Sequence, residues 1–435
     1  MGFRLLPGHH HSVRLASATT DWVRPRRWVA GLLLAVGALL LIAYARRDED
    51  FRGYLTVGEL ALQGRDLYAD APPGINTWPP FFSLVCVPLA LMARASATGA
   101  RLVWLGLNLD ALAIVLALSL RIVARGPADE RADIPVPAVS SLMGLAVLVL
   151  TSRYVVSNFE HLQINLLIFA LALGGLTLIA RGREIAGGWT LGAAAALKVM
   201  PVLFVPYLLW KRRWNAALWT AIATVLLSAS PVLAYGPRRL DAYFLGWIAS
   251  VRAGWNVGKM NLSVYAMWDR VVGHHLVPFA APGTDALPPS GRPIVGVLLA
   301  LSLLAALLLT LWSFTRHAAD HRAEPAEWSI VFLVAALFGT VAWKAYLVVL
   351  LLPNALLLDA WRAPELDPGL RRGALGVLLA AFTLGVLTTD GLLGRSLGGR
   401  LEMGSVVTLA ALLMLAGLCW FRRRLAVAPG RAAGA

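Results

Sequence analysis

The stretch PIVGVLLALSLLAALLLTLWSFT, residues 293–315, contains no charged side chain. An apolar segment of this length crosses the roughly 30 Å of hydrocarbon in a bilayer when it forms a helix. Similar runs recur along the chain, in which 58% of the 435 residues are hydrophobic and only 14% are charged. Soluble domains contain about 45–50% apolar and about 25% charged residues, so a soluble globular protein is excluded. We therefore predict an all-α, polytopic membrane protein.

Twelve apolar runs are long enough to be transmembrane helices, and we predict that they form one domain, residues 28–425. The runs lie at 28–45, 79–93, 101–123, 137–153, 163–180, 187–210, 214–235, 293–315, 328–343, 345–361, 373–390 and 403–421. Segment 187–210 contains Pro201, so it either spans the membrane or forms a re-entrant hairpin broken at that proline.

Basic clusters between the runs, such as Arg422–Arg424, predict the orientation of the chain. Arginine and lysine gather in the short cytoplasmic loops of membrane proteins. We therefore expect both tails, residues 1–27 and 426–435, to be cytoplasmic. Two larger loops, at about 46–78 and 236–292, are expected to lie outside.

The net charge of +15 comes largely from these loop residues and not from a basic face. We therefore expect the lipid bilayer, and not a nucleic acid, as a partner. The two cysteines, Cys86 and Cys419, both lie inside apolar runs. This placement argues against a disulfide framework and against a structural zinc site.

Ionisable side chains inside apolar segments are costly, so each is a candidate for function. Lysine is scarce in this chain, yet Lys198 and Lys344 both lie in apolar segments. A compact ammonium group binds a phosphate as a point charge. The alternative is that both lysines extend to the membrane surface without a ligand. Asp110 lies well inside an expected span, and we expect it to pair with a buried basic group.

Three consecutive carboxylates, Asp48, Glu49 and Asp50, follow the first expected span. A carboxylate at the outer surface can act as a general base toward a substrate hydroxyl within hydrogen-bond reach. The alternative is an ordinary acidic loop.

A second polar cluster begins at Arg153 and leads through His161, Gln163 and Asn165 into the next apolar run. These side chains supply donors and acceptors of the kind that hold a phosphate or a sugar. A structural role at the membrane boundary is the alternative, in particular for His161.

The first loop resembles the signature of glycosyltransferase family 87. The resemblance is carried by Asp50-Phe51, by Gly64-x-Asp66-Leu67-Tyr68 and by Trp78-Pro79-Pro80. Later segments follow in the order of the family's motifs: His161–Asn165, Gly188–Pro201, Lys211–Trp214, Asn261–Ser263 and Trp343–Tyr346. Two positions depart from the family pattern: Leu162 stands where the family often has glycine, and Lys344-Ala345 where many members have two histidines.

Members of this family are polyprenol-phosphate-mannose-dependent membrane mannosyltransferases with the GT-C fold. The resemblance therefore implies a GT-C enzyme of the bacterial inner membrane with an extracytoplasmic active site. It implies that Asp50 is the general base, that the sugar is transferred with inversion, and that no metal or cofactor is needed. The expected partners are a polyprenyl-phosphate sugar donor and a glycolipid or glycan acceptor. The residues expected to bind the donor phosphate or sugar are Lys198, Lys344, His161, Gln163, Asn165, Arg153 and Asn261.

Two alternatives stay open. A GT-C enzyme could use another polyprenyl-phosphate sugar, such as arabinose or glucose. A transporter or flippase for a lipid or sugar is the alternative from another class. Transporters often contain paired halves with matched broken helices. Because we find one proline-interrupted segment, 187–210, and no counterpart to it, we favour the enzyme.

Overall fold

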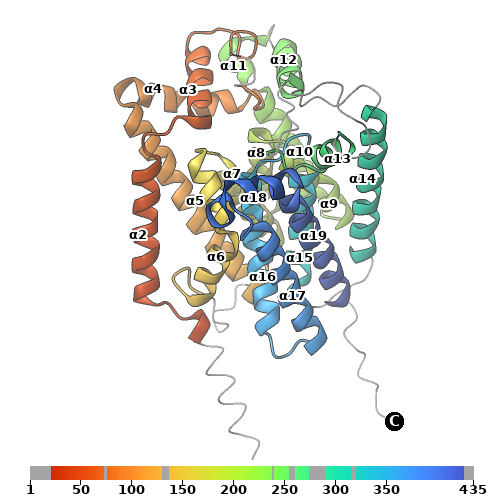
Figure 1. Cartoon of the computed structure of the whole chain (residues 1–435). Coiled ribbons are helices and arrows are strands. Elements are labelled where there is room, and N and C mark those ends of the chain that lie inside the picture. The colour runs from red at the N-terminus through yellow and green to blue at the C-terminus, as the bar shows by residue number, and fades with distance from the viewer. Residues whose placement is uncertain are drawn as a thin grey trace, which may run out of the picture.

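In the computed structural model, every regular element among the described residues is a helix (Figure 1). The described residues are 21–72, 76–129, 137–237, 240–253, 260–273, 291–314 and 320–425. The prediction of an all-α protein is therefore confirmed. Most of the first tail, residues 1–20, and the whole second tail, 426–435, lie outside the described residues, as do parts of the loop 236–292.

Seven helices in the described part of the chain are long and apolar enough to cross a membrane, or eight if one bent pair is a single span. They are Asp21–Tyr44, Ala97–Arg125, Leu142–Glu160, Trp214–Tyr235, Arg292–Phe314, Lys344–Arg362 and Val406–Leu425, and the bent pair is Pro368–Gly385 with Asp390–Met403. Three shorter apolar helices are Phe82–Ala95, Asn165–Ala180 and Met200–Trp210. The structure thus supports a polytopic membrane protein, whereas the predicted count of twelve spans is not confirmed.

The segment predicted at 187–210 is broken, but the break lies at Lys198 and not at Pro201. Helix α8 (Glu184–Leu197) ends where Lys198 becomes extended, with φ −156° and ψ 122°. A short 3₁₀ helix, η1 (Met200–Leu203), then leads into α9 (Phe204–Trp210). Pro201 lies in the first turn of η1, where its missing N–H costs no hydrogen bond. The break turns the Lys198 side chain toward helix α7 (Asn165–Ala180).

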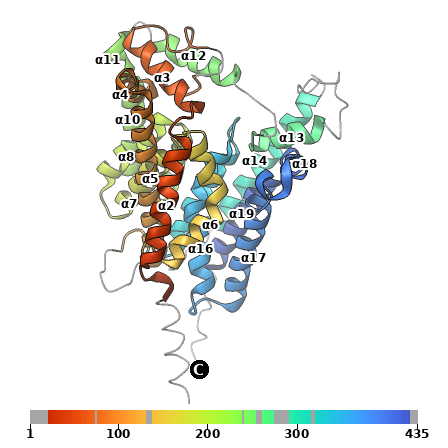
Figure 2. The ribbon, with the colours of Figure 1, turned by 60° about the vertical axis from the view of Figure 1, so that its left-hand side comes forward.

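One end of the bundle is built by α3 (Glu49–Leu62), the start of α4 (Phe82–Ala95) and α12 (Leu240–Ala253) (Figures 1 and 2). Gly58 allows α3 and α4 to approach closely, because a Cβ there would lie 2.5 Å from the carbonyl oxygen of Cys86. The first of the two expected loops, at about 46–78, therefore contains a helix, α3. Helices α12 and α13 (Val264–Val271) lie in the second expected loop.

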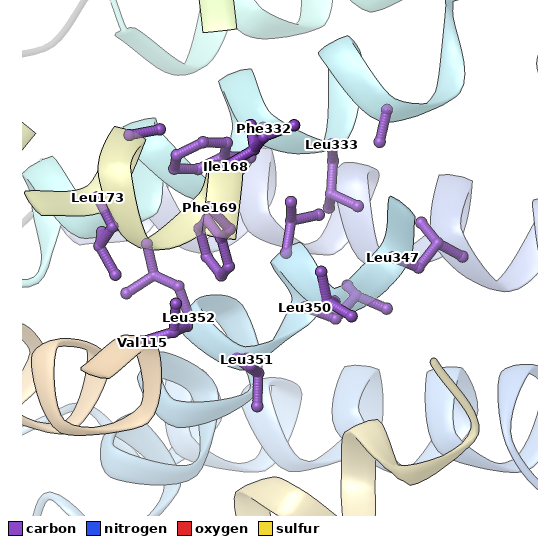
Figure 3. Packing of buried hydrophobic residues seen from close by; sticks show 14 of the residues in the cluster. Val115, Ile168, Phe169, Leu173, Phe332, Leu333, Leu347, Leu350, Leu351 and Leu352 are labelled. Carbon is purple, nitrogen blue, oxygen red and sulfur yellow. The ribbon is translucent and has the colours of Figure 1, made fainter. Parts of the chain in front are cut away.

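The core of the bundle fixes the segment that begins at Lys344. Helix α16 (Leu351–Arg362) and the 3₁₀ helix before it, η5 (Lys344–Leu350), pack against α7, α15 (Ala323–Leu337) and α5 (Ala97–Arg125) (Figure 3). Phe169 and Phe332 meet edge to face with ring centroids 4.8 Å apart. Lys344, the first residue of η5, is thus fixed by a tightly packed apolar segment.

The remaining helices complete the bundle. They are α2 (Arg27–Tyr44), α6 (Leu142–Glu160), α10 (Trp214–Ala229), α11 (Pro231–Tyr235), α14 (Arg292–Phe314), α17 (Pro368–Gly385), α18 (Asp390–Met403) and α19 (Val406–Leu425). Helix α19 ends with Arg422–Arg424 at the end of the bundle opposite α3 (Figure 1). The polar residue Asp390 begins α18, which bends by 77° from α17.

Candidate active site

A chain of hydrogen bonds joins four of the predicted site residues. Gln163 Nε2 donates to Asp50 Oδ2 at 2.6 Å, and Asn165 Nδ2 donates to Gln163 Oε1 at 2.6 Å. Lys198 Nζ donates to Asn165 Oδ1 at 2.6 Å and lies 3.5 Å from the centre of the Tyr346 ring. Asp50 comes from the first turn of α3 and Lys198 from the break after α8, so three distant segments meet here.

The three consecutive carboxylates of the first loop have different partners. Asp48 pairs with Arg101, and Glu49 Oε2 lies 3.5 Å from His161 Nδ1. The side chains of Asp48 and Glu49 are exposed, at 61% and 41%. Asp50 turns inward to Gln163. Of the three, Asp50 alone lines a cavity among those described below.

Asp50 lies between two cavities. The larger, of about 290 Å³, is lined by aromatic side chains, among them Trp78, Trp247 and Tyr346, together with Lys198. The smaller, of about 200 Å³, is lined by Asp50, Ser157, His161, Gln163, Met260, Trp343 and Lys344. Asp50 and Gln163 form part of both walls, as does Trp343. A group bound in either cavity can therefore reach the same carboxylate.

The environment of Asp50 makes it a stronger base than an exposed carboxylate. Burial raises the pKa of Asp50 above its ordinary value, because the charged form loses its hydration. The nearby side chains of His161 and Lys198 and the hydrogen bond from Gln163 oppose this rise. The carboxylate is thus desolvated but still supported in its ionised form, as a general base requires.

Leu162, which stands where the family often has glycine, adopts a backbone conformation that favours glycine. Its φ angle of 49° lies in the left-handed region, where glycine is favoured. A glycine at this position would adopt this turn without strain. In this chain Leu162 adopts the turn. Its side chain is buried, and its carbonyl oxygen accepts a hydrogen bond of 2.7 Å from Trp104 Nε1. The left-handed turn points His161 and Gln163 to the cavities.

Arg153 and Lys344 meet at a carboxylate that none of the sequence motifs contains. Glu402 Oε1 accepts from Arg153 Nη2 at 2.6 Å and lies 2.5 Å from Lys344 Nζ. Arg153 Nη1 also donates to the carbonyl oxygen of Gly385 at 2.8 Å. Sequence analysis missed Glu402 because it lies just before an expected span, 249 residues from Arg153.

Asn261 lies in the interior, where it holds two loops together. Its Oδ1 accepts from the backbone N–H of Ser263 and of Ala342, each at 3.0 Å. Its Nδ2 donates to the carbonyl oxygen of Thr340 at 3.1 Å. Because Thr340 lines the larger cavity, Asn261 shapes this wall from behind.

Asp110 lies on an exposed face of α5, and no basic partner surrounds it in the described residues. The expectation that it pairs with a buried basic group is therefore wrong. The face of a helix on which a side chain lies depends on packing, which the apolar run around Asp110 does not reveal.

Comparison with known proteins gives the family. The profile described as "Glycosyltransferase family 87" matches residues 76–342, more than half of the 435-residue chain. The chain belongs to glycosyltransferase family 87. Two relatives are each named "Polyprenol-phosphate-mannose-dependent alpha-(1-2)-phosphatidylinositol mannoside mannosyltransferase". The protein of Mycolicibacterium smegmatis is 28% identical over 341 residues, which cover 72% of this chain and 69% of the relative. That of Mycobacterium tuberculosis is 26% identical and covers 72% and 70%.

This family 87 chain is also similar to a solved structure, ArnT from Cupriavidus metallidurans bound to undecaprenyl phosphate. The match has 16% sequence identity, covers 92% of this chain and 77% of ArnT, and has a TM-score of 0.42. The GT-C architecture therefore stays a prediction for this member of family 87.

Proposed function

We propose that this glycosyltransferase moves mannose from a polyprenyl-phosphate donor to an acceptor hydroxyl, with inversion. The observation that carries the proposal is the position of Asp50 in the shared wall of two cavities. A transferase must bring a donor and an acceptor to one base, and two adjoining cavities with a common carboxylate suit this task. The names of the two relatives support mannose and a polyprenyl-phosphate donor.

The proposed reaction is a single displacement. Asp50 takes the proton of the acceptor hydroxyl, and the resulting oxygen nucleophile attacks the anomeric carbon of the sugar. The bond between that carbon and the phosphate oxygen breaks, and polyprenyl phosphate leaves with the bonding electrons. Because attack and departure occur on opposite faces of the sugar, the anomeric configuration inverts.

Cations next to Asp50 support this assignment. Charge develops on the phosphate oxygen as the bond breaks, and fixed positive groups stabilise it. Lys198 lines the larger cavity and Lys344 the smaller one. Each of the two adjoining cavities thus has a lysine that can stabilise the monoester dianion of the leaving phosphate, and the proposed reaction uses no metal ion.

We infer that Asp50 lies on the extracytoplasmic side. The end of the bundle formed by α3 lies opposite the end at which Arg422–Arg424 lies. Arginine clusters favour the cytoplasm, so the α3 end would face outside, and the C-terminal end of α19 inside.

The acceptor follows from the relatives as a first candidate. Both are named for a phosphatidylinositol mannoside, and we propose a glycolipid of this class as the acceptor. Polysaccharide and protein hydroxyls are the other acceptors to be compared with it. Among the sugars, arabinose and glucose are to be compared with mannose.

The deciding experiment uses the purified full-length protein in detergent, where no compartments exist. A panel of polyprenyl-phosphate mannose, glucose and arabinose is incubated with phosphatidylinositol mannoside, and the products are identified by mass spectrometry. Gain of one hexose from the mannose donor alone, with release of polyprenyl phosphate, supports the proposal. Transfer from the glucose or arabinose donor would assign that sugar to the enzyme in place of mannose. Lack of any donor turnover would favour a transporter or flippase.

A further inference from the structure

Glu402 is a buried carboxylate at the end of α18, with 2% of its surface exposed. Its Oε1 binds two cations, Arg153 Nη2 at 2.6 Å and Lys344 Nζ at 2.5 Å. A carboxylate in the interior of a membrane protein is costly unless it is paired. Here the three side chains together carry a net charge of +1.

The two cations differ in their access to the cavity. Lys344 lines the smaller cavity together with Asp50 and Trp343. The side chain of Arg153 is only 6% exposed, and its guanidinium also donates to Gly385, the last residue of α17, and to Thr388 just after it. Arg153 therefore anchors Glu402, while Lys344 faces the space beside Asp50.

We propose that Glu402 is a positioning residue, which holds the Lys344 ammonium group at the wall of this cavity to bind the phosphate of a polyprenyl-phosphate substrate. The inference rests on the proposed function. A lysine side chain has a flexible four-carbon stem, and fixing it in advance reduces the entropy lost when a ligand binds. An ammonium group has three N–H donors, so its contact with Glu402 leaves donors for a phosphate.

A second buried carboxylate provides a matched control. Glu327 of α15 is 1% exposed and also binds a lysine and an arginine, with Lys211 Nζ at 3.0 Å and Arg422 Nη2 at 2.7 Å. It lines neither cavity beside Asp50. Arg422 lies near the end of α19 and Glu402 just before its start, so about 25 Å of helix separates the two clusters. Loss of Glu327 tests what loss of a buried ion cluster does by itself.

The test is a double-mutant cycle on the full-length protein in lipid nanodiscs, with undecaprenyl phosphate as the probe. We measure its equilibrium binding to the wild type, to Lys344→Met, to Glu402→Gln and to the double variant. We expect each single variant to bind undecaprenyl phosphate at least about tenfold more weakly than the wild type does, since a charge-assisted contact is lost or misplaced. The double variant should bind within about threefold of Lys344→Met, because Glu402 acts through Lys344. Glu327→Gln should bind within about twofold of the wild type.

Glu402→Asp keeps a counterion for Arg153 and shortens the side chain by one methylene. It guards against misfolding of Glu402→Gln, and correct folding is checked by size-exclusion chromatography. We expect Glu402→Asp to weaken binding by roughly threefold to tenfold, and to have no further effect when Lys344 is already Met.

Independent losses that multiply in the double variant overturn the positioning role. So does a Glu402→Asp variant that binds like the wild type, or an equal loss in Glu327→Gln. If the wild type neither binds the probe nor turns over a polyprenyl-phosphate sugar, the proposed function itself fails. If wild-type turnover is intact and the coupling is absent, only the present inference fails.

Discussion

Gln163 donates a hydrogen bond of 2.6 Å to Asp50, and this contact orients the carboxylate at the boundary of two cavities. The same glutamine accepts from Asn165, which in turn accepts from Lys198. The side chain proposed to take a proton is therefore linked to a side chain proposed to bind a phosphate. Each part of this network can be altered and measured separately.

Asp50→Asn keeps the size of the side chain and removes its basicity. We expect turnover to fall by roughly 10²–10⁴-fold, since a general base contributes about this much. Sugar transfer by the purified variant is the measurement. Asp48→Asn is the matched control, because Asp48 lies two residues away and pairs with Arg101 at the surface. Normal turnover in Asp50→Asn with a loss in Asp48→Asn would show that the base was misassigned.

The pH dependence of kcat/KM should report on Asp50. Burial raises its pKa, and only the ionised form accepts a proton, so activity should be lost as the pH falls through that raised value. Gln163→Leu removes a donor that favours the ionised form. The pKa of Asp50 should then rise further, and the acidic limb should move to higher pH. An acidic limb that stays in place in Gln163→Leu contradicts this assignment.

Lys198→Met keeps the length of the side chain and removes its charge. We expect donor use to weaken by roughly 10- to 150-fold, which corresponds to the loss of about 1.5–3 kcal/mol from a charge-assisted hydrogen bond. Donor titration at saturating acceptor measures the effect. Lys211→Met, which alters a lysine that is bound to Glu327, should leave donor use unchanged. Equal donor dependence in Lys198→Met and the wild type would show that Lys198 does not contact the phosphate.

Sidedness can be measured by cysteine labelling in intact spheroplasts. A cysteine in place of the exposed Ala69 should react with a membrane-impermeant thiol reagent, and one in place of the exposed Arg372 should not. The native Cys86 and Cys419 are buried and should contribute little background. The opposite labelling pattern would place Asp50 on the cytoplasmic side and exclude the proposed topology.

Chelation tests the expectation that no metal is required. Turnover in the presence of EDTA should stay within about twofold of the untreated enzyme. A loss that added Mg²⁺ or Mn²⁺ restores would require a metal ion in the mechanism.

The sequence predicts the helices that are long and continuously apolar. The runs 28–45 and 293–315 differ from α2 and α14 by one residue at each end, because such a run has no alternative to a helix in lipid. The number of spans is harder to predict. Helices such as α4 and α8 contain only 14 residues, and hydropathy alone does not separate a short span from a buried helix.

The candidate site is predicted in part. Asp50 and the segment around Gln163 are identified from residue type and order, and they do lie together in the structure. Glu402 could not be identified in this way, since its partners lie 58 and 249 residues away. The bend between α17 and α18 also has no simple signal, although Gly394, with φ 77°, lies inside α18.

The order in which a ribosome produces the chain gives the Glu402 cluster a further meaning. Arg153 and Lys344 are synthesised before Glu402, and α19 follows it. A nascent chain that has not yet reached residue 402 contains two cations of this cluster without their shared carboxylate. The cavity wall beside Asp50 can therefore be completed only late in membrane insertion. Messages truncated shortly before this codon should yield proteins that insert most of their helices but never mature into an active enzyme.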